Sequence, residues 1–312
     1  MDIIQKHPIL DFPPETLHIV RKMFDLDQPG AMSDAIRILN EWVKMQKHFM
    51  RTTFDERFLE NIIITSKGSV ERAKQRLDKY CTMKTLLSRF YEISDPNCYK
   101  HNIDSYANIC VLPKFNSNYE RVGIAKFYKN INTSNFMDFY RYEIAISEYL
   151  KLHDYSVGMI LVLDYRDTDL VEFIRQMNIV DLRQALSIFI EAYGLRIKGI
   201  HFITGSKLIE TIVSITKQML SPKLGDRMVV HNKLETLYDY IPKEMLPQEY
   251  GGNERSLTAL HDEWYELISS KEHVEYLEEV KKRGTNECYR AKDEFNENYM
   301  GMPGTFRTLS VD

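Results

Sequence analysis

Four basic residues stand in two close pairs on either side of a strongly apolar segment, 207–220. Arg196 and Lys198 lie two residues apart in a stretch with strand-like alternation, so their side chains are expected on one face. Lys223 and Arg227 follow the apolar segment. Cations in this arrangement predict an anion site of the kind that binds phosphate groups. The alternative is a set of solvated surface cations on an acidic protein, and the pattern alone leaves this open.

The apolar segment itself, KLIETIVSITKQML, has the spacing of a helix. One narrow polar stripe is formed by Glu210, Ser214, Lys217 and Ser221. Apolar residues cover the remaining surface, which is wider than a helix packed on one side requires. Two interpretations remain open. The helix is buried between layers, or it is a lid whose apolar side covers a pocket and can face a bilayer.

Candidate catalytic residues are isolated in the sequence. Asp164 and Asp167 follow an apolar, strand-like run, where carboxylates of α/β enzymes often lie, but no partner acid or base accompanies them. A role in a turn is therefore favoured. His201 stands between apolar residues of a strand, which indicates a buried core histidine. Residues 205–207 form a fragment of a phosphate-loop pattern without its leading glycine, and we interpret them as a helix start. No enzyme is expected.

Composition and spacing exclude several further classes. Cys81, Cys98, Cys110 and Cys288 form no CxxC pair and no histidines form HxxxH or HExxH, so we expect reduced thiols and no metal or cofactor site. A net charge of −4 argues against bulk nucleic-acid binding. No apolar run reaches the length of a signal peptide or of a transmembrane helix. We expect a cytoplasmic protein whose membrane contact is peripheral.

The first part of the chain has the pattern of an all-α module. We predict a helix at 14–24, a second capped by Ser33 and Asp34, a third at 54–64, a fourth capped by Ser69 and a fifth at 82–91. Strand-like alternation is missing here. We therefore assign residues 1–95 to an N-terminal helical module.

After Asp95 short strand-like runs alternate with helix-like stretches. Strands are predicted at 109–112, 121–128, 157–165, 194–204 and 227–231, and helices at 136–151, 168–177, 181–193 and 207–220. This order predicts an α/β sandwich with a mostly parallel sheet. We expect residues 96–255 to form this domain. Residues 256–312 would add C-terminal helix at 256–283 and a tail.

Residues 195–252 resemble the hallmark segment of the CRAL-TRIO family of lipid-binding proteins. The matching elements are Lys198 to Ile203, Leu220-Ser221, Lys223-Leu224, Arg227, His231, Ile241-Pro242, Leu246-Pro247 and Glu249 to Gly252. Within the family the segment is most similar to the branch of the α-tocopherol transfer protein and the cellular retinaldehyde-binding protein. Helices at 54–91 and the ending GTFRTLSVD extend the resemblance, the ending being similar to tails of arthropod members. Departures at Thr204, Ser206 and Gln218 touch the ends of the lid helix.

The resemblance implies a CRAL-TRIO sandwich in which a lid helix covers a pocket for one lipid. It also implies a basic cleft for phosphoinositide head groups, formed here by Arg196, Lys198, Lys223 and Arg227. From strand alternation and the family pattern, we predict a pocket lined by Met159, Leu161, Leu163, Ile200, Phe202, Ile209, Ile212, Val213, Ile215 and Met219, with Phe189 and Tyr193 as aromatic wall and Tyr140, Ile144 and Ser147 at the far end. Ser147 or a tyrosine hydroxyl would bond the ligand head group. Any of these residues could equally be ordinary core.

The function implied by the resemblance is a carrier for a small hydrophobic lipid of tocopherol or retinoid type. It would take the lipid from membranes and release it to them through the lid and the basic cleft. Two alternatives remain open, namely a phosphatidylinositol-type phospholipid exchange protein and a regulatory scaffold whose pocket is vestigial.

Overall fold

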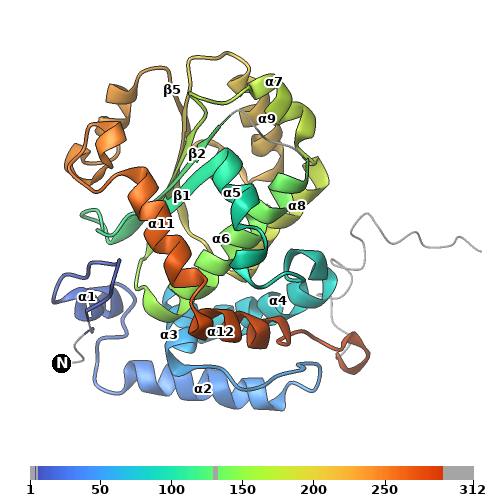
Figure 1. The fold of residues 1–312 in the computed structure, drawn as a ribbon. Coiled ribbons are helices and arrows are strands. Elements are labelled where there is room, and N and C mark those ends of the chain that lie inside the picture. Colours follow the sequence, from blue (N-terminus) through green and yellow to red (C-terminus); the bar gives the residue numbers. More distant parts are fainter. Residues whose placement is uncertain (1–3, 5, 129–132, 291–312) are drawn as a thin grey trace, which may run out of the picture.

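A computed structural model describes residue 4 and residues 6–128 and 133–290 of the chain. The predicted arthropod-type ending at 304–312 lies outside these residues. The helices of the N-terminal part are α1 (Thr16–Lys22), α2 (Ala31–Met45), α3 (Glu56–Thr65) and α4 (Val70–Leu86), followed by the short turns η1 (Ser88–Phe90) and η2 (Pro96–Cys98). This part of the chain is all-α, as predicted, and it lies below the sheet in Figure 1.

Two predicted details of this module are wrong. The helix α2 begins at Ala31 behind Gly30, whose φ of 85° ends the preceding turn, so Ser33 lies inside the first helical turn instead of capping it. The separate helix at 82–91 does not exist, because α4 continues through the buried residues Cys81 to Lys84 to Leu86. The predicted cap at Ser69 is confirmed, since its side chain accepts a hydrogen bond from the backbone N–H of Arg72 at 3.3 Å.

A mostly parallel sheet follows, as predicted. Its strands are β1 (Ala107–Val111), β2 (Glu120–Phe127), β3 (Gly158–Asp164), β4 (Ile197–Ile203) and β5 (Met228–His231). They lie in the order β1-β2-β3-β4-β5, with β1 antiparallel to β2 and every other pair parallel. The register shifts between Met159 and Ile160, where β3 passes a bulge in β4 at Lys198.

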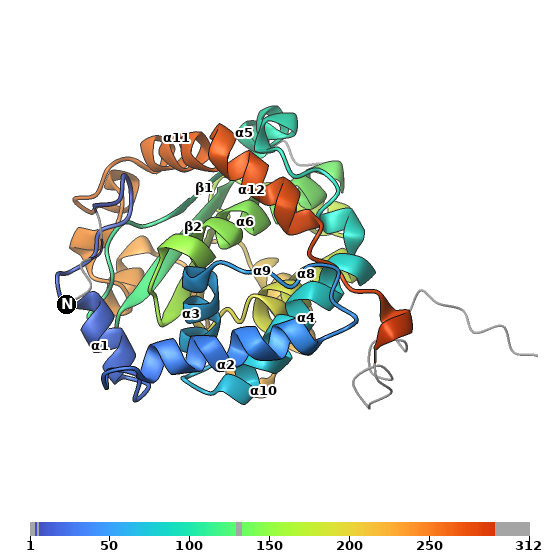
Figure 2. The same cartoon turned by 90° about the horizontal axis from the view of Figure 1, so that it is seen from below.

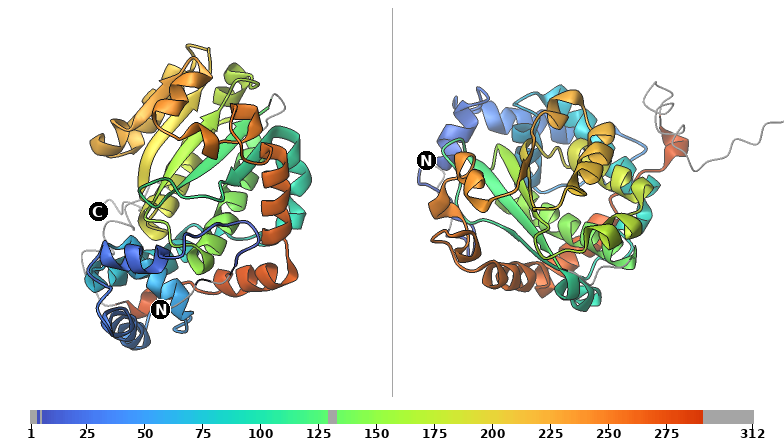
Figure 3. Two further views of the ribbon diagram at one scale, coloured as in Figure 1. Left: turned by 90° about the vertical axis from the view of Figure 1, so that its left-hand side faces the viewer. Right: turned by 90° about the horizontal axis from the view of Figure 1, so that it is seen from above.

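Helices connect the strands and cover the sheet. They are α5 (Lys100–Tyr106), α6 (Thr133–His153), α7 (Leu170–Gln176), α8 (Ile179–Ser187) with the π-helical turn η3 (Ile188–Ala192), α9 (Ile209–Met219) and α10 (Pro222–Gly225). The chain continues with η4 (Leu234–Asp239), η5 (Lys243–Met245), η6 (Gln248–Tyr250), α11 (Leu257–Ile268), α12 (Lys271–Lys281) and η7 (Glu287–Tyr289). Figure 2 shows the N-terminal helices on the side nearest the viewer, and the left view of Figure 3 shows them (blue) at one end of the sheet, with the segment after β5 (orange) at the other end.

One hydrophobic cluster runs through all the predicted parts of the chain. It includes Leu59 of α3, Val162 of β3 and Trp264 of α11, each without exposed surface. The indole N–H of Trp264 donates to the carbonyl of Val111 at 2.8 Å, which ties α11 to the edge strand β1. The division into 1–95, 96–255 and 256–312 remains a prediction, but the core is shared across these boundaries.

A buried polar network joins the helical module to α6. Glu148 of α6 is fully buried and accepts hydrogen bonds from the hydroxyls of Tyr80 at 2.8 Å and Tyr193 at 2.6 Å. It also forms an ion pair with Lys84 of α4 at 3.2 Å, with 1% and 0% of the two side chains exposed. Burial lowers the pKa of Lys84 to about 8, while the nearby Glu148 opposes this shift, so the pair is charged at neutral pH.

Lys84→Met is expected to destabilise the protein strongly, because the carboxylate of Glu148 would remain buried without its cation. We expect the free energy of unfolding to fall by about 3–5 kcal/mol in urea titrations. Adding Glu148→Gln should restore part of the loss. The exposed pair of Lys282 and Glu279 supplies the control, since Lys282→Met should leave the urea midpoint unchanged. An equal effect of both lysine changes would show that the buried pair is not a structural link.

Candidate functional site

A cavity of about 210 Å³ lies between the sheet and the helices α6, α8 and α9. Its wall is formed by Cys110, Val111, Gly123, Ile124, Ala125, Phe127, Phe136, Phe139, Tyr140, Glu143, Ile146, Ser147, Leu150, Met159, Leu161, Val162, Leu163, Tyr165, Phe173, Met177, Leu182, Ala185, Leu186, Phe189, Leu195, Ile197, Ile200, Phe202, Ile212 and Thr216. Nearly all of these side chains are apolar or aromatic. A cavity of this kind favours an apolar molecule over water.

Most of the residues predicted to line a pocket lie on this wall. They are Met159, Leu161 and Leu163 of β3, Ile200 and Phe202 of β4, Tyr140 and Ser147 of α6, Phe189 of η3 and Ile212 of α9. Alternation along the two central strands placed the strand residues correctly, because successive side chains of a strand point to opposite faces of the sheet. That these residues bind a ligand remains a prediction.

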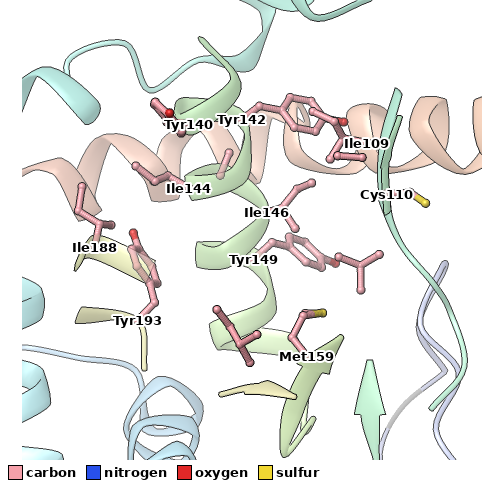
Figure 4. Packing of buried hydrophobic residues seen from close by; sticks show 14 of the residues in the cluster. Ile109, Cys110, Tyr140, Tyr142, Ile144, Ile146, Tyr149, Met159, Ile188 and Tyr193 are labelled. Atoms are coloured by element: carbon pink, nitrogen blue, oxygen red, sulfur yellow. The ribbon is translucent and has the colours of Figure 1, made fainter. Parts of the chain in front are cut away.

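Ile144 and Tyr193, which were predicted to line the pocket, point away from this cavity. Figure 4 shows Ile144 on the side of α6 that faces Ile188 and Tyr193. Ile144 borders a separate, smaller cavity. The hydroxyl of Tyr193 donates to Glu148 and is therefore already used in the buried network. The face of α6 that meets the cavity of about 210 Å³ includes Tyr140, Glu143 and Ser147, and Ile144 lies outside it.

The helix α9 closes the cavity with one narrow face. Ile212 and Thr216 lie on the wall, and Ile209 is buried one turn earlier without reaching it. Val213, Ile215 and Met219, which were also predicted to line the pocket, lie off the wall and are only half-buried. Since only Ile209 and Ile212 of α9 are buried, this helix is covered on one side and is not held between layers.

Sequence reasoning missed an aromatic cluster at one end of the cavity. The rings of Phe127 and Tyr165 are stacked at 5.1 Å, and Phe173 meets Phe127 edge-on at 5.3 Å. Phe136 packs against Phe173 with the same edge-on geometry at 5.0 Å. The helical spacing of Phe136, Tyr140, Glu143 and Ser147 was the signal available in the sequence, because it defines the inner face of α6.

The four predicted cations lie close together. Lys198 forms an ion pair with Glu120, and the guanidinium of Arg227 donates to the carbonyl of Ile197. Burial lowers the pKa of Arg196, and the neighbouring Arg227 lowers it further against the opposing charge of Glu120. Lys223 is exposed and has no hydrogen bond or ion pair with the described residues.

The helical module adds cations that the sequence reasoning missed. The pKa of the exposed Lys67 is lowered chiefly by Arg196, with smaller contributions from burial and from Arg72, Lys223 and Lys198. Burial lowers the pKa of Arg76 to about 10, and the positive charges of Arg196 and Arg72 add to the effect. We call Lys67, Arg72, Arg76, Arg196, Lys198, Lys223 and Arg227 the basic surface. The local signal was the charge-rich stretch that opens α4, SKGSVERAKQR.

Gly194 allows the two parts of the basic surface to meet. Its φ is 66°, and a Cβ atom there would lie 2.4 Å from the guanidinium of Arg76. The same guanidinium donates to the hydroxyl of Ser66 at 3.1 Å, which fixes it beside the segment that leads into β4. Like charges gathered in this way lower one another's pKa, so an anion bound among them would be stabilised.

The residues examined as catalytic candidates have structural partners. His201 is buried, as predicted, and its Nδ1 lies 2.9 Å from Nε2 of His231. Asp164 accepts hydrogen bonds from the backbone N–H of Arg166 at 3.1 Å and from the hydroxyl of Tyr250 at 2.9 Å, which confirms the predicted role in a turn. Asp167 forms an ion pair with Lys126 at 2.7 Å. Among the described residues, no three His, Cys, Asp or Glu side chains are grouped so as to hold a metal ion.

The mostly parallel sheet and its covering helices agree with the sandwich that the resemblance implied. Residues 106–252, from the end of α5 through η6, match the family model described as CRAL/TRIO domain. This segment of the chain is therefore similar to a CRAL-TRIO domain, and the predicted resemblance is confirmed.

Individual proteins are similar to this chain over long aligned regions, but the sequence identity is low. "Alpha-tocopherol transfer protein-like" of Mus musculus is 22% identical over 224 residues, 70% of this chain and 64% of its own length. "Clavesin-1" of Xenopus laevis is 25% identical over 250 residues, 77% of this chain and 73% of its own length. The crystal structure of Sfh5 is similar with a TM-score of 0.44 and 16% identity, covering 85% of this chain and 100% of that one.

Proposed function

We propose that this protein carries one small hydrophobic lipid in the cavity and exchanges it with membranes. The observation that carries the proposal is the apolar cavity that α9 closes with Ile212. Burying about 400 Å² of apolar ligand surface would contribute roughly 10 kcal/mol, from which association costs subtract several kcal/mol. A ligand bound this tightly needs a route of release. We infer a ligand of tocopherol or retinoid type, and the name of the mouse relative supports the first of these.

Membrane contact supports such a route. Leu208, Ile215 and Met219 share one face of α9 that the core does not use, and Leu208 is 42% exposed. The basic surface adjoins this helix through α10, which carries Lys223. Apolar side chains beside cations suit the surface of an anionic bilayer. No helix among the described residues is both long and apolar enough to cross one, so we propose a cytoplasmic protein that docks on membranes peripherally.

Mass spectrometry of lipid extracted from the purified protein tests the proposal. One neutral hydrophobic lipid per chain is expected. A phospholipid would favour the alternative of phosphatidylinositol-type exchange. An empty protein that binds no added lipid would contradict carriage and favour a scaffold with a vestigial pocket. Turnover of the bound lipid would show an enzyme, which we do not expect, because the candidate catalytic side chains are held in structural contacts.

Leu208→Ser with Met219→Ser is expected to slow lipid transfer between vesicles roughly tenfold, because α9 would lose apolar contact with the bilayer. Ligand affinity should change little, since neither residue lies on the cavity wall. The matched control is Met45→Ser with Met50→Ser. These two methionines are 68% and 57% exposed and lie elsewhere on the protein, so this variant also loses exposed apolar surface. Equal transfer rates for both double variants would contradict a membrane role for α9.

A further inference from the structure

One ionisable carboxyl group lies on the wall of the otherwise apolar cavity. Glu143 projects from the inner face of α6, between Tyr140 and Ser147. It forms no hydrogen bond or ion pair with the described residues. No lysine, arginine or histidine is present among the described residues of the wall. Among the residues that the structure describes, this carboxyl group therefore has no partner.

An unpartnered carboxyl group in such a place is costly for the protein. Desolvation raises the free energy of its charged form, and buried polar groups are nearly always hydrogen-bonded. Burial raises the pKa of Glu143 to about 7, and no neighbouring cation opposes this. Cys110 of β1, labelled to the right of α6 in Figure 4, is another titratable residue of the wall. Its thiol pKa is raised by burial and then by Glu143, so it supplies no positive charge.

The chemistry of this group selects among ligand head groups. A hydroxyl donates to a carboxylate and accepts from a protonated acid, so it satisfies Glu143 in both states. A carbonyl satisfies only the protonated state. A carboxylate or phosphate would place a second negative charge in the same poorly solvated site. Ser147, one helical turn further along the same face, offers a second hydroxyl contact.

We propose that Glu143 anchors the head group of the carried lipid, and that this lipid is neutral and bears a hydroxyl group. Fatty acids and phospholipids are excluded from the cavity by the same carboxyl group. The inference rests on the proposed lipid carriage and deepens it, because it names the class of head group. It also distinguishes the proposed carrier from a phospholipid exchanger, whose ligand would bring a phosphate.

The test compares two fluorescent probes with the same hydrocarbon chain, cis-parinaric acid and the corresponding alcohol. Measured at about pH 8, where free carboxyl groups are ionised, the unchanged protein should bind the alcohol at least tenfold more tightly than the acid. Glu143→Gln should reduce this preference at least tenfold, mainly by improving binding of the acid. Glu143→Leu should weaken binding of the alcohol and remove the preference for the alcohol over the acid. Glu275→Gln on the exposed face of α12 changes the net charge equally and should leave the preference intact.

The thermal stability of the Glu143 variants shows whether this residue anchors a ligand or supports the fold. Both Glu143 variants should keep or raise the Tm, because the carboxyl group has no partner to lose among the described residues. Equal binding of alcohol and acid by the unchanged protein, or an undiminished preference in Glu143→Gln, would overturn the inference while leaving lipid carriage in place. A protein that binds neither probe and carries no extracted lipid would overturn the proposed function and the inference together.

Discussion

Ile212→Asp should abolish high-affinity capture of a hydrophobic ligand. Ile212 is 4% exposed and is the apolar side chain with which α9 reaches the cavity wall. A carboxylate there would be buried against the ligand at a cost of several kcal/mol. Since about 1.4 kcal/mol corresponds to a factor of ten in affinity, we expect a loss of at least about a hundredfold. Displacement of a fluorescent lipid measures the effect.

Ile215→Asp is the matched control for this change. Ile215 lies on the same helix, carries the same side chain and is half-buried, but it does not border the cavity. Its replacement should leave ligand affinity within about threefold, which is less than 1 kcal/mol. Similar losses in both variants would mean that α9 supports folding generally. Unchanged binding in Ile212→Asp would show that the ligand lies elsewhere.

Lys67→Ala with Lys223→Ala should weaken binding to anionic vesicles about ten- to thirtyfold. Both lysines are exposed members of the basic surface, and their side chains form no hydrogen bond or ion pair with the described residues, so we expect their removal to leave the fold intact. Each cation near an anionic membrane contributes on the order of 1 kcal/mol. Vesicle sedimentation measures the effect, and the difference from the unchanged protein should shrink as salt rises. Arg227 is left in place because its guanidinium bonds the backbone of β4.

Lys271→Ala at the start of α12 with Lys282→Ala directly after this helix changes the net charge equally, and α12 lies away from α10 in Figure 2. This control should bind vesicles like the unchanged protein. Ligand affinity should be the same in both double variants, because none of the lysines touches the cavity. If Lys67→Ala with Lys223→Ala released its lipid while still binding vesicles, the basic surface would be a support for the cavity and not a membrane site.

Local patterns predicted the elements that hold the cavity. The apolar run of β3 and the alternation in β4 required a buried, mostly parallel sheet, and their inward residues lie on the wall. Ile197 was missed because the bulge at Lys198 breaks the alternation, so that Ile197 and Ile200 both face the cavity. No single-strand pattern encodes a bulge.

Long-range pairing explains the remaining errors. The apolar surface of α9 exceeds what its packing uses, so hydrophobicity alone identified Ile212 together with residues such as Ile215 that face away from the cavity. The cations of the helical module were missed because Arg76 meets Gly194 through a contact between segments far apart in the sequence. Glu143 was missed because a charged residue in a helix is ordinarily assigned to solvent.

The basic surface forms only when the helical module docks beside the segment that leads into β4, and Gly194 permits this close contact. Lys67, Arg72 and Arg76 come from the helical module, whereas Lys198 lies in β4 and Arg196 directly precedes this strand. A multivalent anion that binds only the assembled surface also stabilises the contact between these segments. By thermodynamic linkage, the two effects are equal in free energy: the contact favours anion binding as much as anion binding favours the contact. A membrane rich in such head groups would therefore stabilise the docking of the helical module against the sheet.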